Sequence, residues 1–320
     1  MSLIGFEETV RTIDAPREVR PTLGGGVDTV PLSSPHLFES IVVPIDGSHF
    51  AEHAIPLALA LARRSGGVLK LVRVFTPGET ATLYPGGDAF DVIEGQLRKD
   101  ARNDLERMQH RIALAAPEVT VMTHLVEAPS VSDGLMRISR TADLVVMATH
   151  GRGWFARFFL GSNGRELLRG RSRPTIFVRG RNAPVDVSGD AVPRNLVVAL
   201  DGRRLSEGAL DVAGAVARLT GARSTLLHVD NPEEDDERFA HSSPEGYLRW
   251  TRREFAKRAP DVSTCIVREA ADPTRGLLSH ADESGADLIV VTSRPEANSV
   301  RRTAESLIRK SPVPVLVVGE

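Results

Sequence analysis

The sequence predicts an α/β protein of two tandem, doubly wound domains, each a five-stranded parallel sheet flanked by helices. Short β-branched runs alternate with helical patterns, which is typical of parallel βαβ units with buried strands. The run Glu39-Ser-Ile-Val-Val-Pro-Ile-Asp-Gly47 returns as Arg194-Asn-Leu-Val-Val-Ala-Leu-Asp-Gly202, and Ala142-Asp-Leu-Val-Val146 returns as Ala286-Asp-Leu-Ile-Val290. A chain of 320 residues has room for two domains of about 150 residues each.

In the first unit we expect strands at about 40–45, 68–75, 119–126, 143–148 and 174–179, with helices between them. The first helix repeats apolar residues at i, i+3 and i+4, and so does its counterpart in the second unit. These faces consist of Ala51, Ala54, Ile55, Ala58, Leu59 and Ala62, and of Leu205, Ala209, Val212, Ala213 and Val216. Right-handed crossovers then place a ligand crevice at the carboxyl ends of the strands.

The domain boundaries follow from composition. Residues 1–37 contain Pro, Gly and Thr without a clear period, which predicts a partly disordered N-terminal arm. The first domain is expected over 38–182 and the second over 194–320. The segment 183–193 contains Pro and Gly without a clear period and is predicted to be the linker.

Composition narrows the class of protein. The hydrophobic fraction of 41%, the charged fraction of 26% and the net charge of −2 describe a globular chain without the basic excess that attracts nucleic acid or anionic lipid. The single cysteine, Cys265, excludes an intrachain disulfide framework and is expected to be a small core or half-buried residue of a strand. No apolar run is long enough to span a membrane and no signal pattern is present, so we expect a cytoplasmic location.

The loop after the strand at 143–148 has the features of a phosphate cradle. Glycines, among them Gly151 and Gly161, let the backbone approach an anion closely. Ser162 and Asn163 open the next helix, where unpaired N–H groups and the helix dipole favour a phosphate. His150 has no Ser, Cys or carboxylate partner at a suggestive spacing, so no catalytic residue is predicted there.

The spacing Ala148-x2-Gly151-x9-Gly161-Ser162 resembles the nucleotide loop of universal stress proteins, which reads Gly-x2-Gly-x9-Gly-Ser/Thr. The run Ile41-Val-Val-Pro-Ile-Asp-Gly-Ser48 resembles the first strand and turn of those domains. The resemblance covers roughly residues 38 to 180 and implies the Rossmann-like fold of adenine nucleotide alpha hydrolases. It also implies that the two fifth strands pair inside the chain, at Thr175–Val178 and Val315–Val318, as a pseudo-dimer that leaves a further homodimer open.

The same resemblance implies a set of cofactor-binding residues. Asp46 is expected to contact the nucleoside, although an Asp at this position also caps a turn or helix, and both roles are compatible. Pro44, Val74 and Met147 are expected to line the adenine pocket; for Val74 and Met147 ordinary core packing is the alternative. The residues expected to hold the phosphates are Ala148, Gly151, Gly161, Ser162 and Asn163. Ala148 takes the place of the first glycine of the family pattern. Asn163 replaces a residue that is commonly apolar in the family, which does not change the prediction.

The second unit keeps the frame and loses these features. Ser293, Glu296, Arg301 and Arg302 align with Ala148, Gly151, Gly161 and Ser162, and that loop contains no glycine. Asp201 is retained, but Ala199 replaces Pro44, and the acidic run Asp230-Asn-Pro-Glu-Glu-Asp-Asp-Glu237 would repel phosphates. We interpret this half as a structural or partner-binding copy with a degenerate site.

The sequence therefore favours a stress-response protein that binds ATP, with Mg²⁺ on its phosphates, as a regulatory or conformational ligand of the first domain. Hydrolysis is at most slow, because the P-loop signature and an obvious water-activating base are missing. Two alternatives stay open. One is a nucleotide-independent dimerisation or partner-binding stress protein; the other is an adenylate-transferring enzyme, whose Ser-Gly-Gly-x-Asp-Ser loop is absent here.

Overall fold

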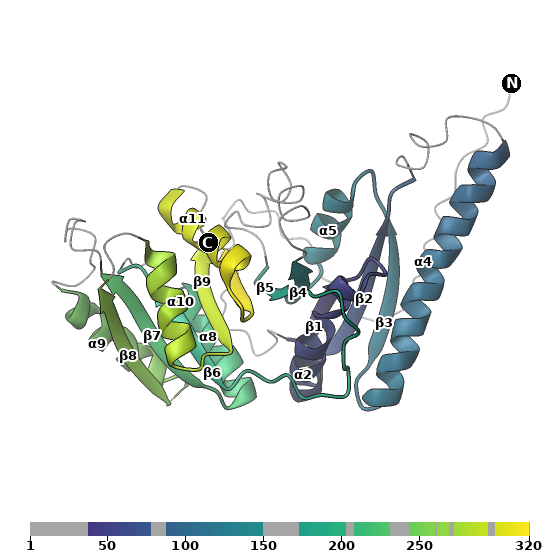
Figure 1. The fold of residues 1–320 in the computed structure, drawn as a ribbon. Helices are drawn as coiled ribbons and strands as arrows, with labels where there is room; N and C mark the ends of the chain where they lie inside the picture. The colour runs from purple at the N-terminus through teal and green to yellow at the C-terminus, as the bar shows by residue number, and fades with distance from the viewer. Residues whose placement is uncertain are drawn as a thin grey trace, which may run out of the picture. The chain divides into compact units, whose positions relative to one another are not determined.

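The computed structural model describes residues 38–77, 88–149, 173–202, 208–230, 243–259, 261–268, 272–293 and 298–319. Ten strands in these ranges form one sheet with the order β3-β2-β1-β4-β5-β10-β9-β6-β7-β8 (Figure 1). The strands are β1 (Ser40–Pro44), β2 (Val68–Phe75), β3 (Val121–Glu127), β4 (Leu144–Thr149), β5 (Thr175–Arg179), β6 (Asn195–Leu200), β7 (Arg223–Asp230), β8 (Val262–Arg268), β9 (Leu288–Ser293) and β10 (Val315–Gly319). The five strands expected in the first unit are confirmed, each within about two residues.

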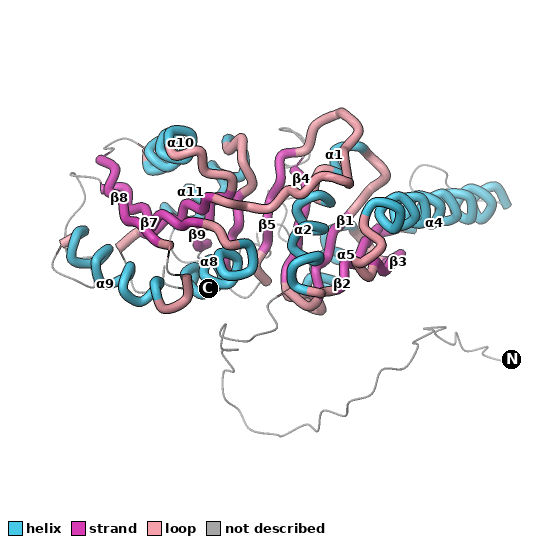
Figure 2. Tube along the Cα trace, turned by 90° about the horizontal axis from the view of Figure 1, so that it is seen from below, coloured by secondary structure: helices cyan, strands magenta, loops and turns pink. Residues whose placement is uncertain are grey.

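Helices cover both faces of this sheet. They are α1 (His49–Glu52), α2 (Ile55–Ser65), α4 (Asp88–Ala115), α5 (Val131–Ser139), α8 (Gly208–Thr220), α9 (Pro244–Ala256), α10 (Pro273–Glu283) and α11 (Asn298–Lys310). The largest core cluster joins α2, α4, α8 and α9 to one face, whereas α5, α10 and α11 cover the other. Figure 2 shows this layering clearly in the second half, where β7 and β8 lie between α9 and α10. The predicted doubly wound α/β class is confirmed.

The two halves join at their fifth strands. Within each half the paired strands are parallel, but β5 and β10 pair in the antiparallel direction, with Leu316 opposite Ile176. Both side chains are fully buried. The expected pairing of the fifth strands is therefore present in the structure, and it removes two sheet edges that would otherwise be open.

The first predicted helix is divided in two. Ser48 caps α1 by accepting a hydrogen bond from the Ala51 N–H at 3.3 Å, and α1 ends after one turn at Glu52. Pro56 lies in the first turn of α2. Proline has no N–H and its ring clashes with the carbonyl four residues earlier, so one helix cannot continue from α1 through Pro56. The predicted apolar face is still buried in full. In the second half, Leu205 lies outside the described residues, and the other four positions are buried.

The repeated Ala-Asp pair has a structural role in both halves. Asp143 accepts a hydrogen bond from the Ser40 N–H at 2.9 Å, and Asp287 accepts one from the Asn195 N–H at 2.9 Å. Each aspartate thus holds the amino end of the first strand beside the fourth strand of its own half.

The predicted linker contains no helix or strand, yet it packs against the first half. Val187 is buried in the main core. Arg64 of α2 donates two hydrogen bonds of 2.9 Å to the Asp190 carboxylate, and Arg111 of α4 donates one to the Val185 carbonyl. The segment is consequently held to α2 and α4.

Candidate functional site

The turn after β1 is built around Asp46. Its Oδ1 atom accepts hydrogen bonds from the Ser48 N–H at 2.9 Å and from the Ser48 hydroxyl at 2.6 Å. Gly47 lies between them with φ at +84°, a conformation that favours glycine. The capping role considered for Asp46 is therefore confirmed. Its carboxylate remains exposed at the carboxyl end of β1, where a nucleoside contact stays a prediction.

Pro44 ends the pairing between β1 and β4. Ser40 forms its hydrogen bonds on the β4 side, because its carbonyl accepts from the Asp143 N–H, whereas Ile45 donates to Val72 on β2. Since alternate residues of a strand face alternate neighbours, the nitrogen of Pro44 also faces β4 and carries no hydrogen. The β1–β4 register stops at Val42 opposite Val145, although β1 pairs with β2 as far as Pro44. The irregularity expected at Pro44 is thus an early end to the hydrogen bonding between the two strands.

The three predicted adenine-lining residues lie on one face of neighbouring strands. Val74 is partly buried and Met147 is 2% exposed, and both belong to the core cluster on the α5 side. Pro44 shares this side, because Val42, two residues earlier, packs there with Val72. The side chain of Val74 lies directly against Gly134 of α5. Core packing of Met147 and Val74 is therefore confirmed, and their contact with a ligand remains a prediction.

Ala148 lies on the opposite face, buried at 5% exposure in the core cluster of α2 and α4. Its strand, β4, is held to β5 up to its last residue, where the Thr149 carbonyl accepts a hydrogen bond from the Gly180 N–H at 3.0 Å. The glycine loop starts at the next residue, at the same edge as the Asp46 turn. Gly151, Gly161, Ser162 and Asn163 lie outside the described residues.

The structure adds a charged cluster that the sequence did not reveal. Arg73 of β2 and Arg107 of α4 both pair with the Asp104 carboxylate of α4. Arg73 and Asp104 are 23% and 22% exposed, whereas Arg107 is 76% exposed. Only a weak sequence signal could have indicated this cluster. Arg73 lies two residues after Leu71 and four after Leu69, so it shares their strand face, which packs against the core.

The corresponding edge of the second half is arranged differently. The β6–β9 register runs to Val198 opposite Val290, with Ala199 in the place of Pro44. His228 stands where Arg73 is in the first half; it is buried, and its Nδ1 atom lies 2.9 Å from the Leu200 carbonyl. Ser293, aligned with Ala148, is fully buried. Glu296 and the acidic residues 231–237 lie outside the described residues.

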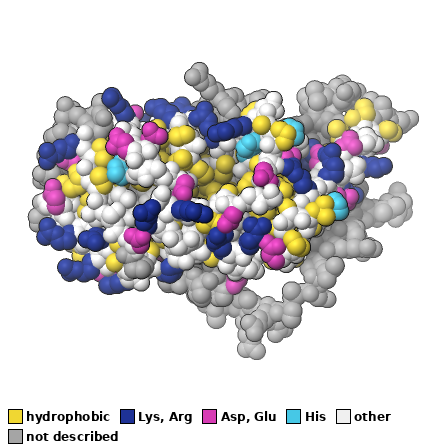
Figure 3. Space-filling model, turned by 60° about the horizontal axis from the view of Figure 1, so that its bottom comes forward, with side chains coloured by type: hydrophobic (Ala, Val, Ile, Leu, Met, Phe, Trp, Pro, Cys, Tyr) yellow, Lys and Arg dark blue, Asp and Glu magenta, His cyan; other side chains and the backbone are white. Residues whose placement is uncertain are grey.

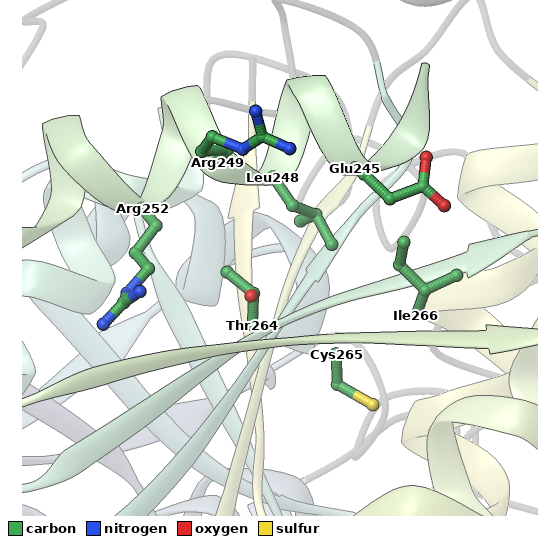
Figure 4. A pocket seen from close by; sticks show the side chains of 7 residues that line it. All are labelled: Glu245, Leu248, Arg249, Arg252, Thr264, Cys265 and Ile266. Carbon is green, nitrogen blue, oxygen red and sulfur yellow. The ribbon is translucent and has the colours of Figure 1, made fainter.

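A cavity of about 370 Å³ lies elsewhere, between α9 and the edge strand β8. It is lined by Glu245, Leu248, Arg249, Arg252, Thr264, Cys265 and Ile266, and Figure 4 shows the Cys265 side chain turned away from α9. Cys265 is half-buried as expected, and burial, together with the charge of Glu283, raises the pKa of its thiol. A raised pKa disfavours the reactive thiolate form of Cys265.

Two expectations from the composition concerned charge and membrane spans. On the face in Figure 3, acidic and basic side chains are interspersed. Among the described residues, no helix combines the length and apolarity that a membrane span requires.

Comparison with protein families matches the universal stress protein family to residues 37–179 and again to residues 193–319. A universal stress protein of Mycolicibacterium smegmatis is 28% identical over 267 residues, covering 79% of this chain and 86% of the relative. One from Mycobacterium bovis is 25% identical over 305 residues, covering 90% of this chain and 100% of the relative.

Among solved structures, a universal stress protein from Archaeoglobus fulgidus gives a TM-score of 0.64 at 18% identity, covering 90% of this chain and 98% of that protein. Adenine nucleotides occur in smaller solved members. One is described as a complex with cAMP (TM-score 0.33, 26% identity, 40% of this chain, 97% of that one). Another from Archaeoglobus fulgidus is described as a complex with dAMP (TM-score 0.33, 24% identity, 40% of this chain, 98% of that one).

Proposed function

Because this chain belongs to the universal stress protein family and contains two such domains in tandem, we propose that it binds ATP in its first domain as a regulatory ligand. Mg²⁺ accompanies the phosphates, and hydrolysis is slow at most. The nucleotide acts by favouring one conformation or assembly of a cytoplasmic protein, whose halves already form the intramolecular pair that single-domain relatives would need two chains to build.

The observation that carries this proposal is the early end of the pairing between β1 and β4. In doubly wound sheets, ligands bind outside the carboxyl ends of the strands where the strand order reverses. In the first half that point lies between β1 and β4, because β1 connects to β2 on one side and has β4 on the other. Pro44 ends the pairing there. The carboxyl ends of β1 and β4 therefore bring together apolar side chains, the exposed carboxylate of Asp46 and the start of the glycine loop.

The residues divide into two roles under this proposal. Pro44, Val74 and Met147 provide the apolar surface for the base, and the Asp46 carboxylate accepts hydrogen bonds from the nucleoside. The amides of Gly151, Gly161, Ser162 and Asn163, with the Ser162 hydroxyl, hold the phosphates. Ala148 precedes this loop in β4, and a methyl group is tolerated in the extended backbone of a strand. The second half lacks the glycines and binds no nucleotide tightly.

Equilibrium dialysis of the purified protein against labelled Mg-ATP tests the proposal. The variant Gly161→Glu places a side chain and a negative charge where phosphate oxygens should lie, so its ATP affinity is expected to fall by at least about 100-fold, which corresponds to two losses of about 1.4 kcal/mol. The matched control is Gly95→Glu on α4, because a Cβ atom at Gly95 would meet no atom within 4 Å. The control is expected to bind as the parent does.

Two outcomes would contradict the proposal. A parent protein that does not bind ATP would favour the nucleotide-independent partner-binding alternative. A folded Gly161→Glu variant that binds ATP as tightly as the parent would place the nucleotide away from the glycine loop.

A further inference from the structure

We propose that Arg73 and Asp104 are positioning residues of the nucleotide site: their ion pair fixes the turn that presents Asp46 and so sets the affinity for ATP. This inference rests on the proposed function. It assigns no ligand contact to either residue. It extends the site from the strand ends to α4, which carries none of the residues expected from the glycine loop or the first strand.

The backbone of the turn lies directly on this ion pair. A methyl group added at Gly47 would be 2.7 Å from Asp104 Oδ2 and 3.0 Å from Arg73 Nη1. The first distance is shorter than a side-chain carbon tolerates, so the pair and the turn are in van der Waals contact. Gly47 is also at positive φ, and the turn thus depends on both the missing side chain and the surface beneath it.

The ion pair adjoins both proposed contacts with the nucleoside. Gly47 follows Asp46, and Arg73 precedes Val74 in β2. Side chains of adjacent strand residues point to opposite faces, so Arg73 faces α4 while Val74 faces α5. The pair therefore holds the Asp46 turn and the end of β2 in a fixed relation from the side opposite the base.

The Asp104 carboxylate is well placed to do this. Both of its oxygens are engaged, Oδ2 by Arg73 and Oδ1 by Arg107. Further along α4, Arg98 pairs with Glu127 and lies 5.0 Å from the centre of the Phe75 ring, which holds the end of β2 to the same helix. Through Arg73 and the Gly47 backbone, Asp104 thus links the turn and the end of β2 to α4.

Calorimetric titration of Mg-ATP into the parent and Arg73→Met tests the inference. Removing the guanidinium removes the ion pair that holds the turn. We expect ATP to bind about fivefold to twentyfold more weakly, which is the size of effect common between groups in contact. Arg73→Lys retains a positive charge and should stay within about twofold of the parent. Arg107→Met is the matched control, because it removes the other partner of Asp104 from the exposed side. It should also stay within about twofold of the parent.

A double-mutant cycle separates positioning from general damage. In the Asp46→Ala background the turn no longer presents the carboxylate, so Arg73→Met should then change affinity by less than about twofold. Equal losses in both backgrounds would overturn the inference. If Arg73→Met does not fold, as judged by its circular dichroism spectrum, Asp104→Asn takes its place in the cycle with the same expectation.

The two proposals fail in different ways. A parent that binds no ATP would overturn the proposed function and this inference with it. A parent that binds ATP, together with a folded Arg73→Met or Asp104→Asn variant of equal affinity, would overturn only the positioning role.

Discussion

The two halves of the chain share a frame but not the edge where a ligand would bind. In both halves, the aspartate just before the fourth strand, Asp143 or Asp287, accepts a hydrogen bond from the start of the first strand. In both halves, the aspartate that follows the first strand is itself followed by a glycine at φ +84°, Gly47 or Gly202. The carboxyl ends of the strands then differ. Pro44 stops the β1–β4 pairing early, while the β6–β9 pairing continues to the residue before Ala199. The residues that build the shared fold of the two halves are therefore different from those at the edge where a ligand would bind.

The same contrast holds beneath the turn. In the first half, Arg73 forms an ion pair with Asp104 of the 28-residue helix α4, which continues past the end of β3 in Figure 1. In the second half, His228 in the place of Arg73 lies against the Leu200 carbonyl, and α9 has 13 residues. The second half thus has a buried contact where the first half has a charged, partly exposed one.

The largest effect should come from breaking the junction that makes the halves one unit. Leu316→Ala removes a fully buried side chain at the β5–β10 pairing and should lower the free energy of unfolding by about 2–5 kcal/mol. Leu114→Ala on α4, where the side chain is 73% exposed, is the control and should change it by less than about 0.5 kcal/mol. Urea denaturation followed by circular dichroism measures both. A loss for Leu316→Ala below about 0.5 kcal/mol, the usual limit for surface substitutions, would show that the junction is not part of the shared core.

Nucleotide should stabilise the whole chain through its first half. At an ATP concentration about 100-fold above the dissociation constant, the gain in unfolding free energy is about 2.7 kcal/mol, because ATP binds only the folded state. Thermal unfolding with and without Mg-ATP measures the shift, and Gly161→Glu should show none. An unchanged midpoint of the parent at millimolar Mg-ATP would count heavily against the proposed site.

Exchanging the residues that distinguish the two strand ends sharpens the comparison. Ala199→Pro removes the N–H that faces β9 and leaves a β9 carbonyl without its donor, so the free energy of unfolding should fall by about 1–3 kcal/mol. Pro44→Ala should change it by less than about 1 kcal/mol, since a new hydrogen bond offsets the added freedom of the unfolded chain. Chemical denaturation of both variants checks this. Equal losses would mean that Pro44 does not end the β1–β4 pairing.

The smallest effect concerns the docked linker and depends on pH. Hydrogen bonds from Arg64 are the main reason that the pKa of Asp190 lies below its ordinary value. A lowered carboxyl pKa stabilises the folded state above the ordinary value and ceases to do so as the pH falls through the folded-state pKa. Because the Asp190 side chain is 47% exposed, the contribution at neutral pH should be only about 0.2–1 kcal/mol. Arg64→Gln should lose it at pH 7 and match the parent near pH 2, by urea denaturation; a constant difference between pH 7 and pH 2 would contradict the assignment.

Much of the fold could be predicted because it depends on local patterns. The strand positions and the buried faces of α2 and α8 follow from periodicity, and the repeated runs predict two domains. The break before α2 was missed, although Pro56 marks it, because the apolar spacing continues across the break. The docking of the linker depends on Arg64 and Asp190, which are far apart in the sequence, and no local pattern indicates such a pair.

The candidate site divides in the same way. Pro44 and Asp46 could be selected as candidates because the continuous run Ile41–Ser48 resembles the first strand and turn of universal stress proteins. The Arg73–Asp104 pair could not, because its two members come from different elements and each resembles an ordinary solvated charge until the strands and α4 are assembled. The glycine loop with Gly151, Gly161 and Ser162 is the part of the site that only the sequence supports.

The central claim is that one half of the chain binds nucleotide and the other does not. Calorimetric titration of Mg-ATP into the parent and into Gly161→Glu tests it most directly. We expect one site per chain in the parent and no tight site in the variant. A stoichiometry near two in the parent, or a tight site that survives in the variant, would show that the second half binds nucleotide and would contradict the account.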